Sequence, residues 1–351
     1  MSNALAQFDK WLEDTGPAAV VVREHLMPVE GKDGVLFPAT YAAAEDSKKF
    51  AGGYNVNAFA DGTNVCLVDS VGSQANRIEP IFAKPDYADL IPQVVIKAGE
   101  KEVNLLDAGH RAADAIVRCS ALKADLQKAF KAVQNGNAEP LAQIAPTSLV
   151  FGVWDSRDTQ AKLPRLVAST IRAFNVKELK RSAQFVPAIP FVEDKQLEEP
   201  KDEKTRKAYS ERGFIHVPAA WSHGGVMAEK VRRDATLSLA ALRLLVVRDD
   251  KGGYDEARTK ELRRYILGLA MVALTAPQCA YLRQGCNLVP DPDAPREFKL
   301  IHADGTPEAL TLSHADALTF AKAAAKAYKV GKDRKVEFDT KAAKQDVAPK
   351  K

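Results

Sequence analysis

Apolar and polar positions in the first third of the chain predict short β-strands joined by loops. Residues 18–29 form an apolar, β-branched run that stops at Gly31 and predicts a core strand. Residues 65–80 begin with a strand pattern and continue with helical spacing, and Pro80 closes that helix. Residues 92–109 predict two short strands about a Gly-Glu-Lys turn. These strands alternate with helical segments from an early point in the chain.

The pattern beyond residue 109 predicts further helices and strands. We expect helices over residues 110–136, 164–174, 229–247, 256–275 and 313–329, and strands over residues 148–156 and 180–192. Asn135–Gly136 and Pro277 are typical helix stops for two of these segments. Short strands interleaved with helices predict an α+β protein built around one sheet, with large insertions. We expect residues 1–330 to form a single domain.

Two segments have too little apolar content for a core. Residues 193–212 hold seven acidic and six basic side chains among twenty residues. From Lys326 to the end, the chain has nine Lys and Arg and four Asp and Glu, so this segment carries a charge of about +5. The net charge of the whole chain is +4. The rest of the chain is therefore close to −1, and residues 331–351 are expected to form a basic, flexible tail.

The composition excludes several classes of protein. A chain of 351 residues with 46% apolar content is expected to fold, and no window reaches the roughly 20 apolar residues that a membrane span needs. The acidic N-terminal segment differs from a signal peptide, so we expect a soluble, cytoplasmic protein. The four cysteines lack a C-x-x-C pair and are expected to be buried thiols: Cys66, Cys119, Cys279 and Cys286.

The common catalytic motifs are missing. The sequence contains no phosphate-binding loop of the G-x-x-x-x-G-K-[ST] type, no G-x-G-x-x-G after a strand, no G-x-S-x-G and no H-E-x-x-H. His25 and His110 have the residue type for acid–base cleavage of RNA, but no pattern constrains them. Carboxylates such as Asp69 and Asp107 occur singly, without the pairing of a two-metal nuclease. We therefore expect no catalytic residue, metal or cofactor.

Residues 157–181 form a basic run with seven Lys and Arg and two acidic residues. On the helix expected there, Arg165, Ser169 and Arg172 form a polar stripe opposite an apolar face. The flanking Lys162 and Arg181 extend the positive charge. The pattern by itself favours an ordinary solvated helix face, and phosphate binding by the stripe is the alternative.

The segment DSVGSQANRIE, residues 69–79, joins a strand to a short helix. Gly72 permits close approach of a ligand to the backbone, and free N–H groups at a helix start attract an anion. Ser73 and Arg77 are four residues apart and suited to one phosphodiester, and Gln74 and Asn76 are further polar candidates. The alternative is that Ser73 or its neighbour Ser70 simply caps the helix.

Several segments, in order along most of the chain, resemble the Csb-one family of Cas-seven-group backbone subunits of type I-G (formerly I-U) CRISPR Cascade complexes. They are FPATY, VCLVDSVGSQANRIE, HRAADAIVR, SLVFGVWDSR, LPRLVASTIRAF, GGVMAEKVRRDATLSLAALRLL and LRQGCNLV. The resemblance implies a RAMP-superfamily fold with an RRM-like (ferredoxin-like) core. It also implies a subunit without nuclease activity.

The resemblance further implies that copies of the chain polymerise along the crRNA in a helical filament that recognises target DNA through the guide. The other implied partners are the large subunit and the crRNA-processing subunit of the complex. The segment GSQANR resembles the loop and basic helix by which RAMP backbones hold guide RNA. The expected RNA-binding residues are Ser73, Gln74, Asn76, Arg77, Lys162, Arg165, Arg172 and Arg181.

The charged segment at residues 193–212 has two interpretations. It is a mobile surface loop, or it is the tip of the thumb hairpin that such subunits carry, with residues 186–220 as the candidate hairpin. Two other functions stay open from the sequence: a RAMP ribonuclease that processes or cuts RNA, and an assembly protein whose basic stripe meets an acidic partner.

Overall fold

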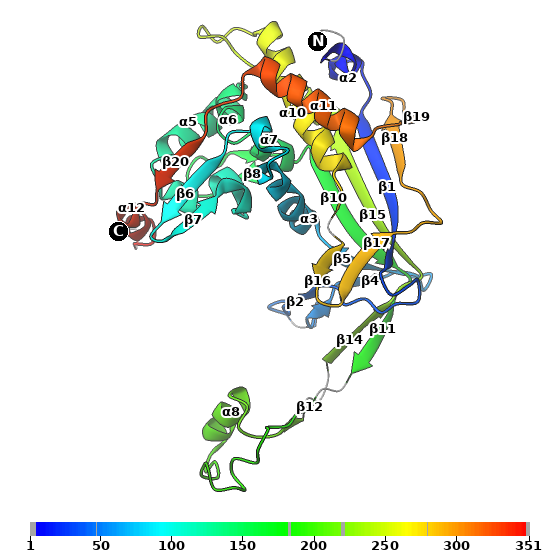
Figure 1. Ribbon diagram of the computed structural model, residues 1–351, viewed down its shortest axis with the longest axis vertical. Coiled ribbons are helices and arrows are strands. Elements are labelled where there is room, and N and C mark those ends of the chain that lie inside the picture. Colours follow the sequence, from blue (N-terminus) through cyan, green and yellow to red (C-terminus); the bar gives the residue numbers. More distant parts are fainter. Residues whose placement is uncertain (1–4, 47, 182–183, 219–221, 279, 349–351) are drawn as a thin grey trace.

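A large antiparallel sheet organises the body of the protein (Figure 1). The computed structural model describes residues 5–46, 48–181, 184–218, 222–278 and 280–348. Nine strands join in the order β16-β17-β1-β15-β10-β5-β4, with β18 beside β1 and β19 beside β18. Their bounds are β1 Ala19–Pro28, β4 Val56–Ala58, β5 Asn64–Asp69, β10 Val167–Phe174, β15 Lys230–Ser238, β16 Tyr281–Arg283, β17 Cys286–Pro290, β18 Glu297–Ile301 and β19 Pro307–Ala309. The strands predicted at residues 18–29 and 65–69 are confirmed.

Helices cover one face of this sheet. The long helix α10, Glu256–Thr275, packs on β10 and β15, and α11, His314–Tyr328, packs on α10. A Cβ at Gly268 of α10 would lie 2.8 Å from the Ala321 Cα of α11, so glycine permits this close approach. The other helices of the body are α2 Asp9–Leu12, α3 Val71–Ile78, α4 Ala115–Arg118, α5 Lys123–Gln134, α6 Glu139–Ala142, α7 Thr147–Phe151, α9 Leu239–Leu242 and α12 Thr340–Asp346, with 3-10 turns η1 Glu79–Ala83, η2 Ala88–Leu90, η3 Leu105–Asp107 and η4 Arg111–Ala113.

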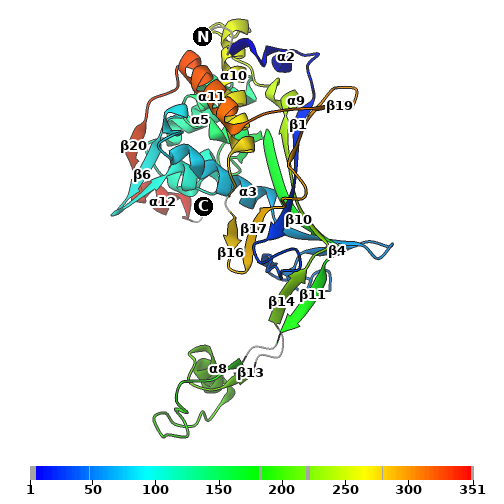
Figure 2. The same cartoon turned by 45° about the vertical axis from the view of Figure 1, so that its right-hand side comes forward.

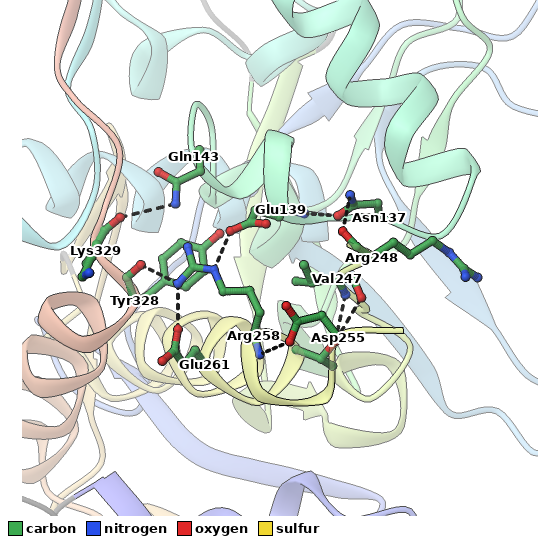
Figure 3. A network of polar contacts seen from close by, with 11 residues as sticks. Asn137, Glu139, Gln143, Val247, Arg248, Asp255, Arg258, Glu261, Tyr328 and Lys329 are labelled. Carbon is green, nitrogen blue, oxygen red and sulfur yellow. Dashed lines mark hydrogen bonds and ion pairs between the residues drawn. The ribbon is translucent and has the colours of Figure 1, made fainter. Parts of the chain in front are cut away.

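A network around Arg258 joins α10 to its neighbours (Figure 3). Its Nε donates to Glu139 at the start of α6 at 2.5 Å, and its Nη1 donates to Glu261 at 2.7 Å and to the Tyr328 carbonyl at 2.8 Å. Burial alone would lower the pKa of Arg258, but the hydrogen bonds with the two carboxylates raise it overall. The network therefore ties three helices to one fully charged guanidinium.

The tail predicted to be flexible is folded against the body over residues 334–346. Strand β20, Arg334–Glu337, adds in parallel to β6, Val94–Ala98, which pairs with β7, Lys101–Asn104. Helix α12 then follows, and Arg118 holds Asp346 at 2.9 Å. This corrects the prediction, because the open edge of β6 supplies backbone hydrogen bonds that a charge count does not reveal.

Three predicted elements are wrong. Residues 147–151 form helix α7 where a strand was expected, and residues 167–174 and 230–238 form β10 and β15 where helices were expected. Burial in β15 alternates strictly, with Val231, Ala235 and Leu237 on the helix-covered side. The apolar spacing there fits either period, and pairing on both edges of β15 decides for the strand.

A two-stranded arm leaves the body and carries helix α8 at its end (Figures 1 and 2). Its stem pairs β11, Lys177–Arg181, with β14, Ser222–Met227, and then β12, Gln184–Phe185, with β13, Val217–Pro218. Helix α8, Glu203–Glu211, has no buried residue. The pairing begins earlier than the predicted hairpin of residues 186–220, of which residues 219 and 220 lie outside the described part.

The remaining short strands are β2 Thr40–Tyr41, β3 Gly53–Tyr54, β8 Val153–Trp154 and β9 Lys162–Leu163. Cys66, Cys119 and Cys286 are buried free thiols as predicted, and Cys279 lies outside the described residues. Within the described ranges, every helix is too short or too polar to cross a bilayer.

Candidate nucleic-acid interface

The turn from β5 into α3 places the GSQANR segment in the helical layer, where α3 packs against β10. Ser70 caps the helix by accepting a hydrogen bond from the Ser73 amide at 3.2 Å, so the predicted cap is present. The atoms nearest to a Cβ built at Gly72 would be the Arg165 Nη2 and the Ser70 Oγ, each 4.0 Å away. The first turn of α3 is therefore open beside an arginine.

Asp69, the last residue of β5, gathers the side chains of this segment. It is buried and accepts hydrogen bonds from Ser73 Oγ at 2.8 Å, Gln74 Nε2 at 2.6 Å and Arg77 Nε at 3.1 Å. Arg283 of β16 donates to it at 3.0 Å. Two arginines on one carboxylate leave this cluster with a net charge of +1.

Two of the predicted RNA-binding residues in this cluster, Gln74 and Arg77, differ in their exposure to solvent. Gln74 is 2% exposed and also accepts from Ser169 Oγ at 2.9 Å, so its burial opposes the direct RNA contact predicted for it. Arg77 is exposed and donates to Asp69 through Nε alone among the hydrogen bonds of the described residues. The Arg77 side chain is 31% exposed, and a phosphate contact by Arg77 stays a prediction.

A second cation lies beneath Asn76. The Arg111 Nη2 donates to Asn76 Oδ1 at 3.2 Å, and Arg111 is buried with a positive φ of 53°. It forms an ion pair with the buried Glu79 at 2.6 Å. Burial raises the pKa of Glu79 to about 7, although the Arg111 charge opposes that rise. Asn76 is exposed above this pair, with its amide oriented by a fixed guanidinium.

Arg165 is the exposed cation of the site. Burial of part of the side chain lowers its pKa, and the nearby Arg111 charge lowers it further. Gly152, at φ 76°, permits this placement, because its Cβ would lie 2.8 Å from the Arg165 Cγ. In the described part of the chain no carboxylate forms an ion pair with Arg165, which makes it available to an anion.

The expected polar stripe is split because residues 167–174 are a strand. Successive residues of a strand point to opposite faces, so Ser169 turns inward to Gln74 while Arg172 lies on the other face. There Arg172 donates to Thr170 at 2.9 Å and pairs in register with Arg232. The predicted stripe is wrong, and Arg172 lies apart from the side chains of α3.

The last two predicted residues lie in other elements. Lys162 of β9 stands 5.4 Å from the Trp154 ring, which is 57% exposed. Arg181 belongs to the arm stem, with its guanidinium 5.7 Å from the Phe37 ring. The structure thus brings together the α3 residues and Arg165, and leaves three predicted cations elsewhere.

The sequence did not reveal the residues that support the site. From the sequence, Asp69 is considered only as an isolated carboxylate without a metal-binding partner, and neither Arg283 nor Arg111 is singled out. The position of Asp69 directly before a capping serine is a usable signal. Arg283 lies more than 200 residues away, and only sheet pairing brings it near. In the described residues, no His, Cys, Asp and Glu group has the arrangement of a metal site.

The Glu79 carboxyl predicts a pH effect on stability. Its folded-state pKa of about 7 is above the ordinary value of 4.5, so the folded state binds the proton more tightly. We expect the free energy of unfolding to be highest below about pH 4.5 with respect to this group, and to fall as the pH rises to about 7. Urea unfolding at several pH values should show this fall in the wild type and a flatter profile in Glu79→Gln. Equal profiles would contradict the assignment.

Comparisons with known proteins bear on this segment. Residues 20–178, which contain β5, α3 and Arg165, match the family described as CRISPR-associated protein GSU0053 (Cas_GSU0053). This confirms the resemblance to a CRISPR-associated, Cas-seven-like family over that part of the chain. No curated protein gives a match. A chain of a solved structure titled "CRISPR RNA-guided surveillance complex, pre-nicking" is 11% identical with a TM-score of 0.38, over 93% of this chain and 99% of that chain.

Proposed function

We propose that this protein, which carries the sequence of a CRISPR-associated, Cas-seven-like family over residues 20–178, binds guide RNA as a non-catalytic backbone subunit of a CRISPR interference complex. The observation that carries the proposal is the surface at α3, where Arg77 and Arg165 are exposed within the matched segment. Arg77 is held by the buried Asp69 carboxylate, whereas Arg165 has no carboxylate partner among the described residues.

Electrostatics support RNA backbone as the ligand. The Asp69 cluster has a net charge of +1, and Arg165 lies beside the open first turn of α3. Phosphates bind to such clusters through charge-assisted hydrogen bonds and release condensed counterions. The contacts available are to phosphate and sugar, which position a strand without selecting its sequence.

The finer features of the proposal follow the family resemblance. The body would contain an RRM-like core, several copies would polymerise along the crRNA, and the arm would serve as the thumb. Other Cascade subunits and target DNA paired to the guide would be the remaining partners, in the cytoplasm. The exposed, highly charged α8 is compatible with a segment that meets RNA or a neighbouring copy.

The ribonuclease is the competing function. His110 is exposed at 3.6 Å from Asp114, and His25 lies on β1 at the sheet, so the two sit on different elements. An acid and a base that act on one phosphodiester must both reach it. The proposal of binding without cleavage therefore rests on the exposed cations of α3, and variants of the two histidines test the ribonuclease.

A protection experiment tests the proposed function. Purified full-length protein is titrated onto a long single-stranded RNA, which is then digested with an added nuclease. We expect protected lengths that increase by a fixed step as copies are added, and intact RNA after incubation with magnesium alone. Protection without a regular step would contradict the filament.

Cleavage of RNA by the protein itself, lost in His110→Ala or His25→Ala, would favour the ribonuclease instead. Absence of RNA binding, together with binding to an acidic protein, would favour the assembly protein.

A further inference from the structure

A cavity of about 960 Å³ lies between the inner face of the sheet and the end of the helical layer. Its walls come from β1, β15, β17 and β18, from α3 with η1, and from the residues around the C-terminal end of α10. Binding sites for nucleotide-sized ligands typically occupy about 300–1,000 Å³. The cavity is therefore large enough for such a ligand.

Arg233 of β15 lines this cavity with an incomplete set of partners. It is 1% exposed, and its Nε donates to Glu24 on the neighbouring strand at 2.6 Å. Its Nη1 and Nη2 are buried, and within the described ranges of the chain neither has a hydrogen-bond partner. Buried donors without an acceptor are costly, so a group that completes them is expected.

The charge of the cavity favours an anion. Arg296 approaches the other Glu24 oxygen at 3.4 Å, so one carboxylate serves two arginines. Arg77 and Lys84 also line the cavity, and Glu24 is the one carboxylate among its lining residues. An arginine with two parallel N–H groups matches the geometry of a phosphate.

The rest of the wall suits the ring of a base or the face of a sugar. Ile78, Leu282, Leu288 and Phe298 line the cavity between its charged residues. Arg77 belongs both to this wall and to the surface of α3, so the cavity is continuous with the candidate RNA interface. A nucleotide has the required combination of a phosphate and a flat, largely apolar ring.

We infer that this cavity binds one nucleotide, with its phosphate held by Arg233 and Arg296 and its base against the apolar wall. The inference rests on the proposed function only if the nucleotide is supplied by the bound RNA. The nucleotide comes either from the bound RNA strand, unstacked at this point, or from the free pool.

Two variants test the cavity without removing Arg233, whose loss would leave Glu24 short of a partner. Ile81→Trp fills the cavity from η1, and Arg296→Gln removes a cation while the pair of Glu24 and Arg233 remains. Ile116→Trp is the matched control, because Ile81 and Ile116 are both partly buried against the same core. The probes are uridine and adenosine monophosphates, inorganic phosphate, and a single-stranded RNA, each titrated onto the full chain by calorimetry.

We expect saturable binding of a monophosphate to the wild type and to the control variant. In both cavity variants the affinity should fall about tenfold or more, and a tenfold fall corresponds to about 1.4 kcal/mol of binding free energy. If RNA affinity falls in the same variants, the nucleotide belongs to the bound strand; if RNA affinity is unchanged, the ligand is a free nucleotide. The inference is overturned if both variants bind every probe as the wild type does. Monophosphate binding without RNA binding would instead refute the proposed function and leave the cavity assignment intact.

Discussion

Replacing Asp69 with alanine is expected to lower the free energy of unfolding by about 3–5 kcal/mol. The carboxylate accepts from Ser73, Gln74, Arg77 and Arg283, and its side chain is fully buried. Its removal leaves the two guanidiniums without their shared partner and the Gln74 amide without an acceptor. Urea unfolding followed by circular dichroism gives the change directly.

Asp125→Ala is the matched control for this stability measurement. Asp125 pairs with Arg334 at 2.7 Å, but its side chain is 58% exposed. Exposed ion pairs contribute about 0–1 kcal/mol, so the control should unfold close to the wild type. If Asp69→Ala changed stability no more than Asp125→Ala, the carboxylate would not be the centre of the α3 cluster.

The double variant Arg77→Ala with Arg165→Ala is expected to weaken RNA binding by about 100-fold or more. Each charge-assisted contact contributes about 1.5–3 kcal/mol, and a tenfold change in affinity corresponds to about 1.4 kcal/mol. Two lost phosphate contacts should also reduce the slope of log affinity against log salt by about 1.4. Asp69 keeps Arg283, Gln74 and Ser73 as donors, so the fold should survive.

The control for RNA binding removes the same number of charges elsewhere. Lys322→Gln with Lys326→Gln neutralises two exposed side chains on α11, on the helical layer. We expect this variant to bind RNA within about threefold of the wild type, since dispersed charges contribute little at moderate salt. Fluorescence anisotropy at several salt concentrations measures both quantities. An unchanged salt slope in the arginine variant would remove α3 as the interface.

The strand-to-helix turn at residues 64–78 could be predicted because its signals are local. A β-branched run ends at Asp69, Ser70 caps, and the helix follows at once. The same local rules were wrong at β10 and β15, where apolar residues fit both a helical and an alternating period. Their assignment depends on which strands pair on either side, and β1 is more than 200 residues away from β15.

The separation of the basic residues shows the same limit. Arg165 and Arg172 are seven apart and would share a helix face, yet Arg165 precedes β10 while Arg172 lies within it, on the face opposite to Ser169. Conversely, Arg283 joins Asp69 from β16, and Arg111 reaches Asn76 with a backbone conformation that non-glycine residues seldom adopt. Neither contact has a signal in local spacing.

The sequence by itself determined the mixed α+β class, the long helices α10 and α11, the capped turn at α3 and the resemblance to a CRISPR-associated family. Those features depend on local propensity, capping and short ordered motifs. Only the tertiary structure decided which cations meet at α3, that residues 334–346 fold onto the body, and that Arg233 faces a cavity with two terminal nitrogens that have no partner among the described residues. These outcomes depend on strand pairing and burial between distant residues, because the energy of a buried charge is set by the groups that surround it in space.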